Sequence, residues 1–357
     1  MNELTVDAET RTASLTAAWE RIRKVKPGIR IRDAAKELGV SEAELLATKT
    51  GKDVIRLKGP WPELLKRLPE LGRVMSLTRN DSCVLENKGP FQKVETFGGG
   101  KHSMATVVGP IEYRTFFGAW SVAFSVTEEK TDRILKSIQV FDQAGDAIIK
   151  VYLQEEASDE AAWIKITEDF RSEDQGTVQA VTPFPEPEYD PIDREALLTD
   201  WAAMKDTHDF FGMLKKHKAH RYEAIEATAG KFTYQVDANT SPRRILESAA
   251  ESKLPIMIFA GNRGNIQIHQ GKVKTIRVLE RGETWLNVLD PDFNMHMKQN
   301  DIKTAWVVKK PTEDGDVTSV ELFDAKRSLV AQFFGLRKPG IPERTGWREL
   351  IATIPAI

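Results

Sequence analysis

The sequence predicts an α+β fold made of two tandem copies of one domain, each a large antiparallel sheet with flanking helices. The 357-residue chain is 41% hydrophobic, which is enough apolar content to bury the cores of two domains. A weak internal repeat has a spacing near 184 residues, far longer than a solenoid repeat, and so indicates a duplicated domain. The repeat pairs Trp19 with Trp201, Arg79 with Arg263, Trp120 with Trp306, and residues 137–153 with 319–335.

A proline-rich segment separates the two copies. Prolines at positions 183, 185, 187 and 191 favour an extended linker. We therefore expect an N-terminal repeat at 1–175, a linker at 176–193 and a C-terminal repeat at 194–357.

The first copy is predicted to open with helices over residues 10–26, 30–39 and 40–47. Gly39 is suited to end the second of these helices. Ser41 is suited to cap the third, with Glu44 completing a capping box.

Strands are predicted after the helices. Residues 120–126 alternate large and small side chains, and two β-rich runs, 137–142 and 147–153, flank a Gly-Asp turn. The second copy repeats this order at 317–324 and 329–335. Helices followed by antiparallel strands are typical of an α+β domain whose helices cover a sheet face.

A histidine lies on the apolar stripe predicted for a helix of the second copy. Steps of three and four place six side chains on one face: Leu197, Trp201, Met204, His208, Phe211 and Leu214. A buried imidazole needs partners, and either a backbone carbonyl or a metal would satisfy one ring nitrogen. The repeat places Lys26 opposite His208, so any such ligand site is expected once per chain.

Composition and short motifs exclude several other classes. The net charge of −2 indicates no polyanionic partner for the whole chain, and the single cysteine, Cys83, fits a reducing cytoplasm. The polar N-terminus and the lack of a long apolar run predict neither a signal peptide nor membrane insertion. His217 and His220 form an HxxH pair without the glutamate or third ligand of a zinc site, which favours surface histidines.

Residues 32–47 resemble a helix-turn-helix. Residues 41–47, at the place of a recognition helix, hold two glutamates and no side chain suited to base edges. We expect any DNA binding to be weak and non-specific, through phosphate contacts of the basic stretch at 21–32.

Five strings in order resemble one family over nearly the whole chain. They are DTHDFFGMLKKH (206–217), EYRTFFGAW (112–120), IMIFAGNRGNIQI (256–268), AWVVKKPTEDGDVTSVELF (305–323) and AQFFGLR (331–337). They are similar to the cytoplasmic haemin-trafficking and haemin-degrading proteins of the HemS/ChuS/PhuS type from Gram-negative haem-uptake systems. This resemblance implies two similar halves with large antiparallel sheets, and haem in a cleft between helical and sheet surfaces.

The resemblance also implies roles for single residues. His208 matches the axial ligand of the haem iron, and Arg114 matches an arginine over the opposite haem face, with Phe116 packing beside it. Arg221, Lys310 and Arg337 match propionate partners, and Gln332 matches a pocket glutamine. Apolar walls for the macrocycle are expected from Phe116, Phe211, Met257 and Phe334. Phe334 departs from the family, whose members often have tyrosine there.

These residues imply a cytoplasmic carrier of haem b that accepts haem from an importer and delivers it to a haem oxygenase for degradation or iron release. An alternative is an enzyme that opens the macrocycle with peroxide or an external reductant. Arg114 would then be the catalytic hydrogen-bond donor on the distal side. A remote alternative is a DNA-binding regulator.

Overall fold

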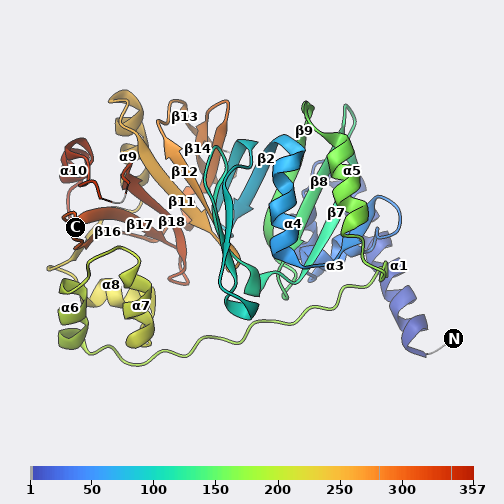
Figure 1. Ribbon diagram of the computed structural model, residues 1–357, viewed down its shortest axis with the longest axis horizontal. Coiled ribbons are helices and arrows are strands. Elements are labelled where there is room, and N and C mark those ends of the chain that lie inside the picture. Colours follow the sequence, from blue (N-terminus) through green and yellow to red (C-terminus); the bar gives the residue numbers. More distant parts are fainter. Residues whose placement is uncertain (1–2, 281, 339) are drawn as a thin grey trace. The chain divides into compact units, whose positions relative to one another are not determined.

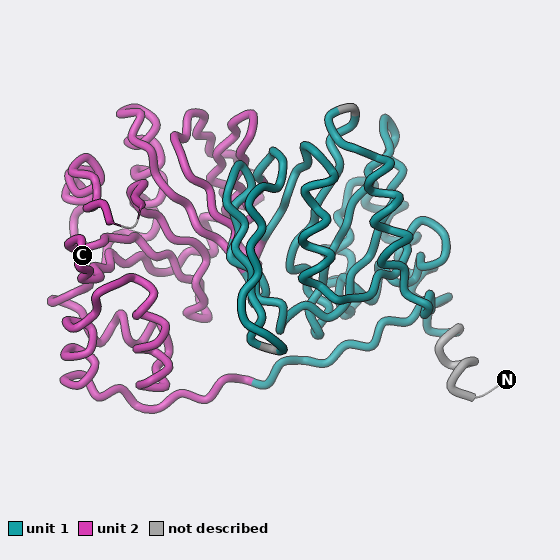
Figure 2. Tube along the Cα trace, viewed as in Figure 1, with its two compact units in different colours: residues 1–78, 87–185, 262–266 teal, residues 79–86, 186–261, 267–357 magenta. Residues whose placement is uncertain are grey.

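The computed structural model describes residues 3–280, 282–338 and 340–357, and its chain forms two compact units. Unit 1 comprises residues 1–78, 87–185 and 262–266, and unit 2 comprises residues 79–86, 186–261 and 267–357 (Figure 2). Each unit thus takes most of one predicted repeat and one short segment of the other. The repeat boundaries at 175 and 194 stay predictions.

Five helices lie among the described residues of unit 1: α1 (Glu3–Val25), α2 (Ile31–Leu38), α3 (Glu42–Ala47), α4 (Trp61–Arg67) and α5 (Glu160–Asp169). The predicted signals are confirmed: Gly39 ends α2 in the left-handed region, at φ 68°, and Ser41 and Glu44 form the capping box of α3.

The strands of unit 1 form two antiparallel groups, in the orders β1-β7-β8-β9-β2 and β4-β5-β6. Strand β3 (Cys83–Pro90) begins in unit 2 and ends in unit 1. The others are β1 (Val54–Leu57), β2 (Gly72–Arg79), β4 (Val94–Phe97), β5 (Met104–Val107), β6 (Glu112–Phe116), β7 (Val122–Glu129), β8 (Ile134–Phe141) and β9 (Ala147–Ser158).

Unit 2 repeats this plan (Figure 1). Its helices are α6 (Arg194–Ala202), α7 (Asp209–Lys216), α8 (Arg221–Ala227), α9 (Ser241–Glu251) and α10 (Thr345–Ala352). Its strands run in the orders β10-β16-β17-β18-β11 and β13-β14-β15. They are β10 (Thr233–Val236), β11 (Ile256–Gly261), β13 (Ile276–Glu280), β14 (Thr284–Leu289), β15 (Phe293–Lys298), β16 (Thr304–Lys310), β17 (Val317–Phe323) and β18 (Leu329–Gly335). Strand β12 (Asn265–Gly271) begins in unit 1 and ends in unit 2.

Strand register shows that β7–β9 and β16–β18 are copies of one motif. Gln139 pairs with Lys150 in unit 1, and Glu321 pairs with Gln332 at the matching position in unit 2. The same irregularity interrupts both pairings, at Phe141 and at Phe323. The α+β class and the duplication are therefore confirmed.

Helices cover both faces of the β10-β16-β17-β18-β11 group. Trp201 and Phe210, from α6 and α7, pack on one face with Trp306. On the other face α9 and α10 contribute Ile245 and Trp347, which pack in one core with Phe333. Alternation along the strands explains this division, since successive side chains point to opposite faces. The ionic cluster described below as part of a candidate site lies on the first face.

Two pairings of the predicted repeat are wrong. Trp306 pairs with Glu321 as Phe124 pairs with Gln139, so Trp306 is equivalent to Phe124 and not to Trp120. Two asparagine turns correct the other pairing. Asn80 donates to Gly261 and Val330 and accepts from the backbone at Ser82 and Cys83. Asn262 makes the matching four bonds, to Ala147, Ile148, Gly264 and Asn265. Asn80 and Asn262 are thus the equivalent residues, and the predicted pairing of Arg79 with Arg263 is wrong by two positions.

Among the described residues, we find no helix whose length and apolar content would let it cross a membrane.

Candidate functional site

His208 lies in a turn and not on a buried helical stripe, so that prediction is wrong. Helix α6 ends at Ala202 and α7 begins at Asp209, with His208 as its N-cap residue and 85% of its side chain exposed. After the break Leu214 stays on the buried face as predicted, but Phe210 takes the buried place that was predicted for Phe211. Phe210, Met213 and Leu214 are buried, while Phe211 is 60% exposed.

Two aspartates produce the break. Asp209 Oδ2 accepts the backbone N–H groups of Lys205 and Asp206, both at 2.9 Å. Asp206 Oδ1 accepts the backbone N–H of His208 at 2.8 Å. Such side-chain bonds to the local backbone replace helical ones, which is why aspartate favours turns and helix starts. The spacing of apolar residues alone did not reveal them.

The imidazole of His208 is held at one nitrogen and open at the other. Its Nδ1 lies 2.5 Å from Asp206 Oδ1. Its Nε2 has no hydrogen-bond partner among the residues that the structure describes. The backbone N–H of His208, followed by its ring, holds the pKa of Asp206 below the usual range, so this carboxylate is ionised.

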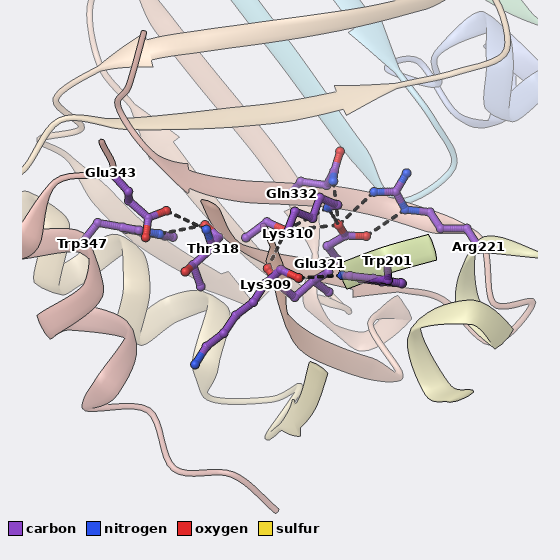
Figure 3. A network of polar contacts seen from close by, with 11 residues as sticks. Trp201, Arg221, Lys309, Lys310, Thr318, Glu321, Gln332, Glu343 and Trp347 are labelled. Carbon is purple, nitrogen blue, oxygen red and sulfur yellow. Dashed lines mark hydrogen bonds and ion pairs between the residues drawn. The ribbon is translucent and has the colours of Figure 1, made fainter. Parts of the chain in front are cut away.

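A buried ionic cluster lies on the sheet face that α7 contacts through Phe210 (Figure 3). Glu321 on β17 accepts hydrogen bonds from both Nε and Nη2 of Arg221, and Lys310 on β16 donates to the same carboxylate at 2.9 Å. Gln332 on β18 donates to the same carboxylate at 3.0 Å, as does Ser319 at 3.1 Å. The structure thus joins Arg221, Lys310 and Gln332 through Glu321, which sequence reasoning missed. Its signal was a single charged residue in the interior of the predicted strand at 317–324.

Aromatic rings connect this cluster with α7. The Arg221 guanidinium lies 4.9 Å from the Phe210 ring centroid and 5.5 Å from that of Phe211. Lys310 Nζ lies 4.6 Å from the Phe210 ring. Cations over ring faces are attracted to the aromatic quadrupole. Phe210, which is two residues from His208, therefore packs α7 against Arg221 and Lys310 of the ionic cluster.

The predicted apolar wall continues along β18 and β11. Phe334 pairs with Met257 across the two strands, and Phe259 stands beside it with ring centroids 5.0 Å apart. Lys310 Nζ lies 6.0 Å from the Phe334 ring. Met257 and Phe334 therefore belong to the same face as the ionic cluster.

Arg337 follows β18. Its positive charge makes a small contribution to the lowered pKa of Asp206 in the His208 turn. Its Nη2 contacts Asp314 at 3.4 Å. Its Nε is buried and has no hydrogen-bond partner among the described residues.

Arg114 and Phe116 belong to unit 1, on β6, whereas the other eight predicted residues belong to unit 2. Arg114 donates to the Tyr113 carbonyl and to Glu112. Phe116 pairs with Met104, which pairs with Phe97, and this row of three shares its sheet face with Arg114. Phe97 and Met104 escaped the sequence analysis. The approach of Arg114 to His208 stays a prediction.

The remaining motifs do not form a metal site in the part of the chain that the structure describes. His217 bonds to Asp200 at 2.6 Å and is only 13% exposed, so it is not the surface histidine that was expected. His220 lies against Tyr189, ring edge to face. All six residues of α3 are buried, so this helix presents no side chains to a DNA groove.

Fold and site define a class of protein: a duplicated α+β chain with an open imidazole beside aromatic rings and cations. The chain matches the family described as "Haemin-degrading HemS.ChuX domain" twice, over residues 39–170 and 218–354. It therefore belongs to this haemin-degrading HemS/ChuX domain family.

Named relatives agree over the whole chain. The hemin transport protein HemS of Yersinia enterocolitica is 37% identical over 332 residues, covering 92% of this chain and 93% of that protein. Holo-PhuS, a heme-binding protein from Pseudomonas aeruginosa, is 45% identical with a TM-score of 0.92, covering 97% and 99% of the two chains. ChuS, described as an E. coli heme oxygenase, is 31% identical with a TM-score of 0.84, covering 95% and 99%.

Proposed function

We propose that this protein binds haem b in unit 2 with His208 as the axial ligand, and carries imported haem through the cytoplasm. The observation that carries the proposal is the exposed imidazole, whose Nε2 is open while Nδ1 is bonded. Neutral imidazole is the commonest axial base for haem iron in proteins. PhuS and HemS, by their descriptions, bind and transport haem or haemin, which supports this assignment.

The surroundings of His208 fit the rest of a haem. Phe211 offers an exposed ring, and Met257 and Phe334 extend the apolar face. Arg221 and Lys310 share the single carboxylate of Glu321, so the cluster has a surplus positive charge whenever both are protonated; burial lowers the pKa of Lys310, while Arg221 keeps its charge. A propionate at the open edge of Arg221 would balance that surplus by a charge-assisted bond.

The test is a haemin titration of the wild type, His208→Ala and the control His217→Ala, followed by absorption spectroscopy. We expect one haem per wild-type chain, a shifted Soret band and weaker binding for His208→Ala, and wild-type behaviour for the control. An unchanged spectrum and affinity in His208→Ala would refute the axial assignment.

A carrier also needs a donor and an acceptor, which we assign to a haem importer and a haem oxygenase. The loaded protein should pass intact haem to a haem oxygenase faster than haem dissociates into solvent. Transfer no faster than passive dissociation, measured with a haem-scavenging protein as acceptor, would argue against a delivery role.

Haem degradation is the second candidate, supported by the description of ChuS as a heme oxygenase. Arg114, one-third exposed on β6, would then donate a hydrogen bond on the distal side of the haem. With ascorbate and catalase, an enzyme would still form one tetrapyrrole product and carbon monoxide, and Arg114→Ala would slow this. A carrier would leave the Soret band intact under the same conditions.

A further inference from the structure

We infer that Asp206 is the positioning residue of the haem ligand: its carboxylate holds the Nδ1 proton of His208, directs Nε2 outward and strengthens the imidazole as an electron donor to iron. This inference rests on the proposed function and extends it to the control of the iron's ligand field.

The geometry around Asp206 constrains the imidazole at two points. One carboxylate oxygen, Oδ1, lies 2.5 Å from the ring Nδ1 and accepts the backbone N–H of the same histidine at 2.8 Å. A single atom, Asp206 Oδ1, therefore holds both the main chain and the ring of His208. An 85% exposed side chain would otherwise sample several rotamers.

Asp206 is itself fixed by the next turn. Its backbone N–H donates to Asp209 Oδ2, and so does that of Lys205, each at 2.9 Å. Asp209 is the first residue of α7, and Phe210 beside it is buried against Arg221 and Lys310. The chain of contacts thus runs from the packed sheet face through α7 to the imidazole.

The chemistry follows from the proton count of a neutral imidazole, which carries one N–H and one lone pair. The carboxylate contact at Nδ1 takes the N–H and leaves the lone pair on Nε2, the nitrogen that faces away from Asp206. A carboxylate partner also increases the basicity of a metal-bound histidine. The bound iron should accordingly favour its ferric state.

A second carboxylate–histidine pair in the same helical layer supplies a matched control. Asp200 Oδ2 lies 2.6 Å from His217 Nε2, but His217 is largely buried and its ring is not open to a ligand. Substitution of Asp200 therefore tests the general effect of losing an aspartate bonded to histidine.

The experiment compares Asp206→Asn, Asp206→Ala and Asp200→Asn in the full-length, haem-loaded protein. Asparagine retains an oxygen for the backbone N–H of His208 but loses the charge. We expect both Asp206 variants to lower the iron–histidine stretching frequency of the ferrous complex in resonance Raman spectra and to raise the haem reduction potential. Asp206→Ala should also weaken haem binding by roughly 10- to 100-fold, and the control should match the wild type.

The outcomes separate this inference from the proposed function. If the wild type binds haem through His208 but both Asp206 variants keep its stretching frequency and potential, Asp206 shapes only the loop and the inference is refuted. A change in Asp200→Asn as large as in Asp206→Asn would refute it as well. If the wild type binds no haem, or His208→Ala keeps the wild-type spectrum, the proposed function fails first.

Discussion

Arg221 and Glu321 form a two-point ion pair across the sheet face of unit 2, with Nε and Nη2 of the arginine each 2.8 Å from a different carboxylate oxygen. Glu321 is completely buried. Burial by itself would raise the pKa of Glu321, but the charges of Arg221 and Lys310 outweigh it and hold that pKa far below its usual range. The carboxylate therefore stays ionised, and both cations depend on it.

Glu321→Gln should destabilise unit 2 strongly. The substitution leaves Lys310 buried without a counter-charge, and breaking a buried pair in this way costs about 3–5 kcal/mol. The free energy of unfolding in urea measures the effect. Glu247→Gln, on the exposed side of α9, is the control and should stay within about 0.5 kcal/mol of the wild type. Equal stabilities for Glu321→Gln and the control would contradict the prediction.

Neighbouring phenylalanines on α7 should separate stability from ligand binding. Phe210 is buried, so Phe210→Ala should cost about 3–5 kcal/mol of folding free energy. Phe211 is 60% exposed, so Phe211→Ala should leave stability nearly unchanged and instead weaken haem binding. Urea unfolding of the apo protein and haemin titration check the two halves. A Phe211→Ala variant with wild-type haem affinity would remove this ring from the site.

A buried histidine should make the protein less stable in weak acid. His269 stacks on Phe293 with ring centroids 3.8 Å apart, and its Nε2 lacks a partner among the described residues. Burial lowers its pKa from 6.5 to about 4, against a smaller opposing effect of Asp290. The native state resists protonation while the unfolded chain protonates near pH 6.5, so stability should fall as the pH drops from 6.5 toward 4.

The size of this effect is set by the difference between the two pKa values and is about 3.5 kcal/mol, at roughly 1.4 kcal/mol per pKa unit. Because carboxylates also titrate in this range, the measurement is the difference between the wild type and His269→Phe at each pH. The difference should grow in favour of the variant as the pH falls. A difference that stays constant from pH 7 to 4 would show that His269 does not resist protonation.

The equivalent turns at Asn80 and Asn262 should contribute similarly to stability. Each side chain donates to two carbonyls and accepts two backbone N–H groups. Replacing either with alanine leaves buried backbone groups unpaired, at a cost of about 1–3 kcal/mol. Chemical denaturation compares both variants with Asn239→Ala, whose side chain is exposed. A large loss for one turn and none for the other would show that the duplication has lost its symmetry here.

The sequence by itself determined the features that depend on local bonding or on repetition. The end of α2 at Gly39 and the capping box of Ser41 and Glu44 involve residues within a few positions of one another. The α+β class and the duplication followed from the order of periodic segments and from the repeated anchors. The family resemblance then supplied His208 and Arg114 as site residues. The helical period alone placed His208 on a buried stripe, which is wrong, and it did not single out Arg114.

Tertiary structure decided the surroundings of these residues, because each depends on groups far apart in the chain. Glu321 lies 100 residues from Arg221 and gains its partners only when β17 packs beneath α8. The helical period placed His208 on the buried stripe because the spacing of apolar residues does not show where aspartate side chains bond to the backbone and end a helix. The free energy of those local bonds, together with the burial of Phe210 in place of Phe211, left the imidazole facing solvent.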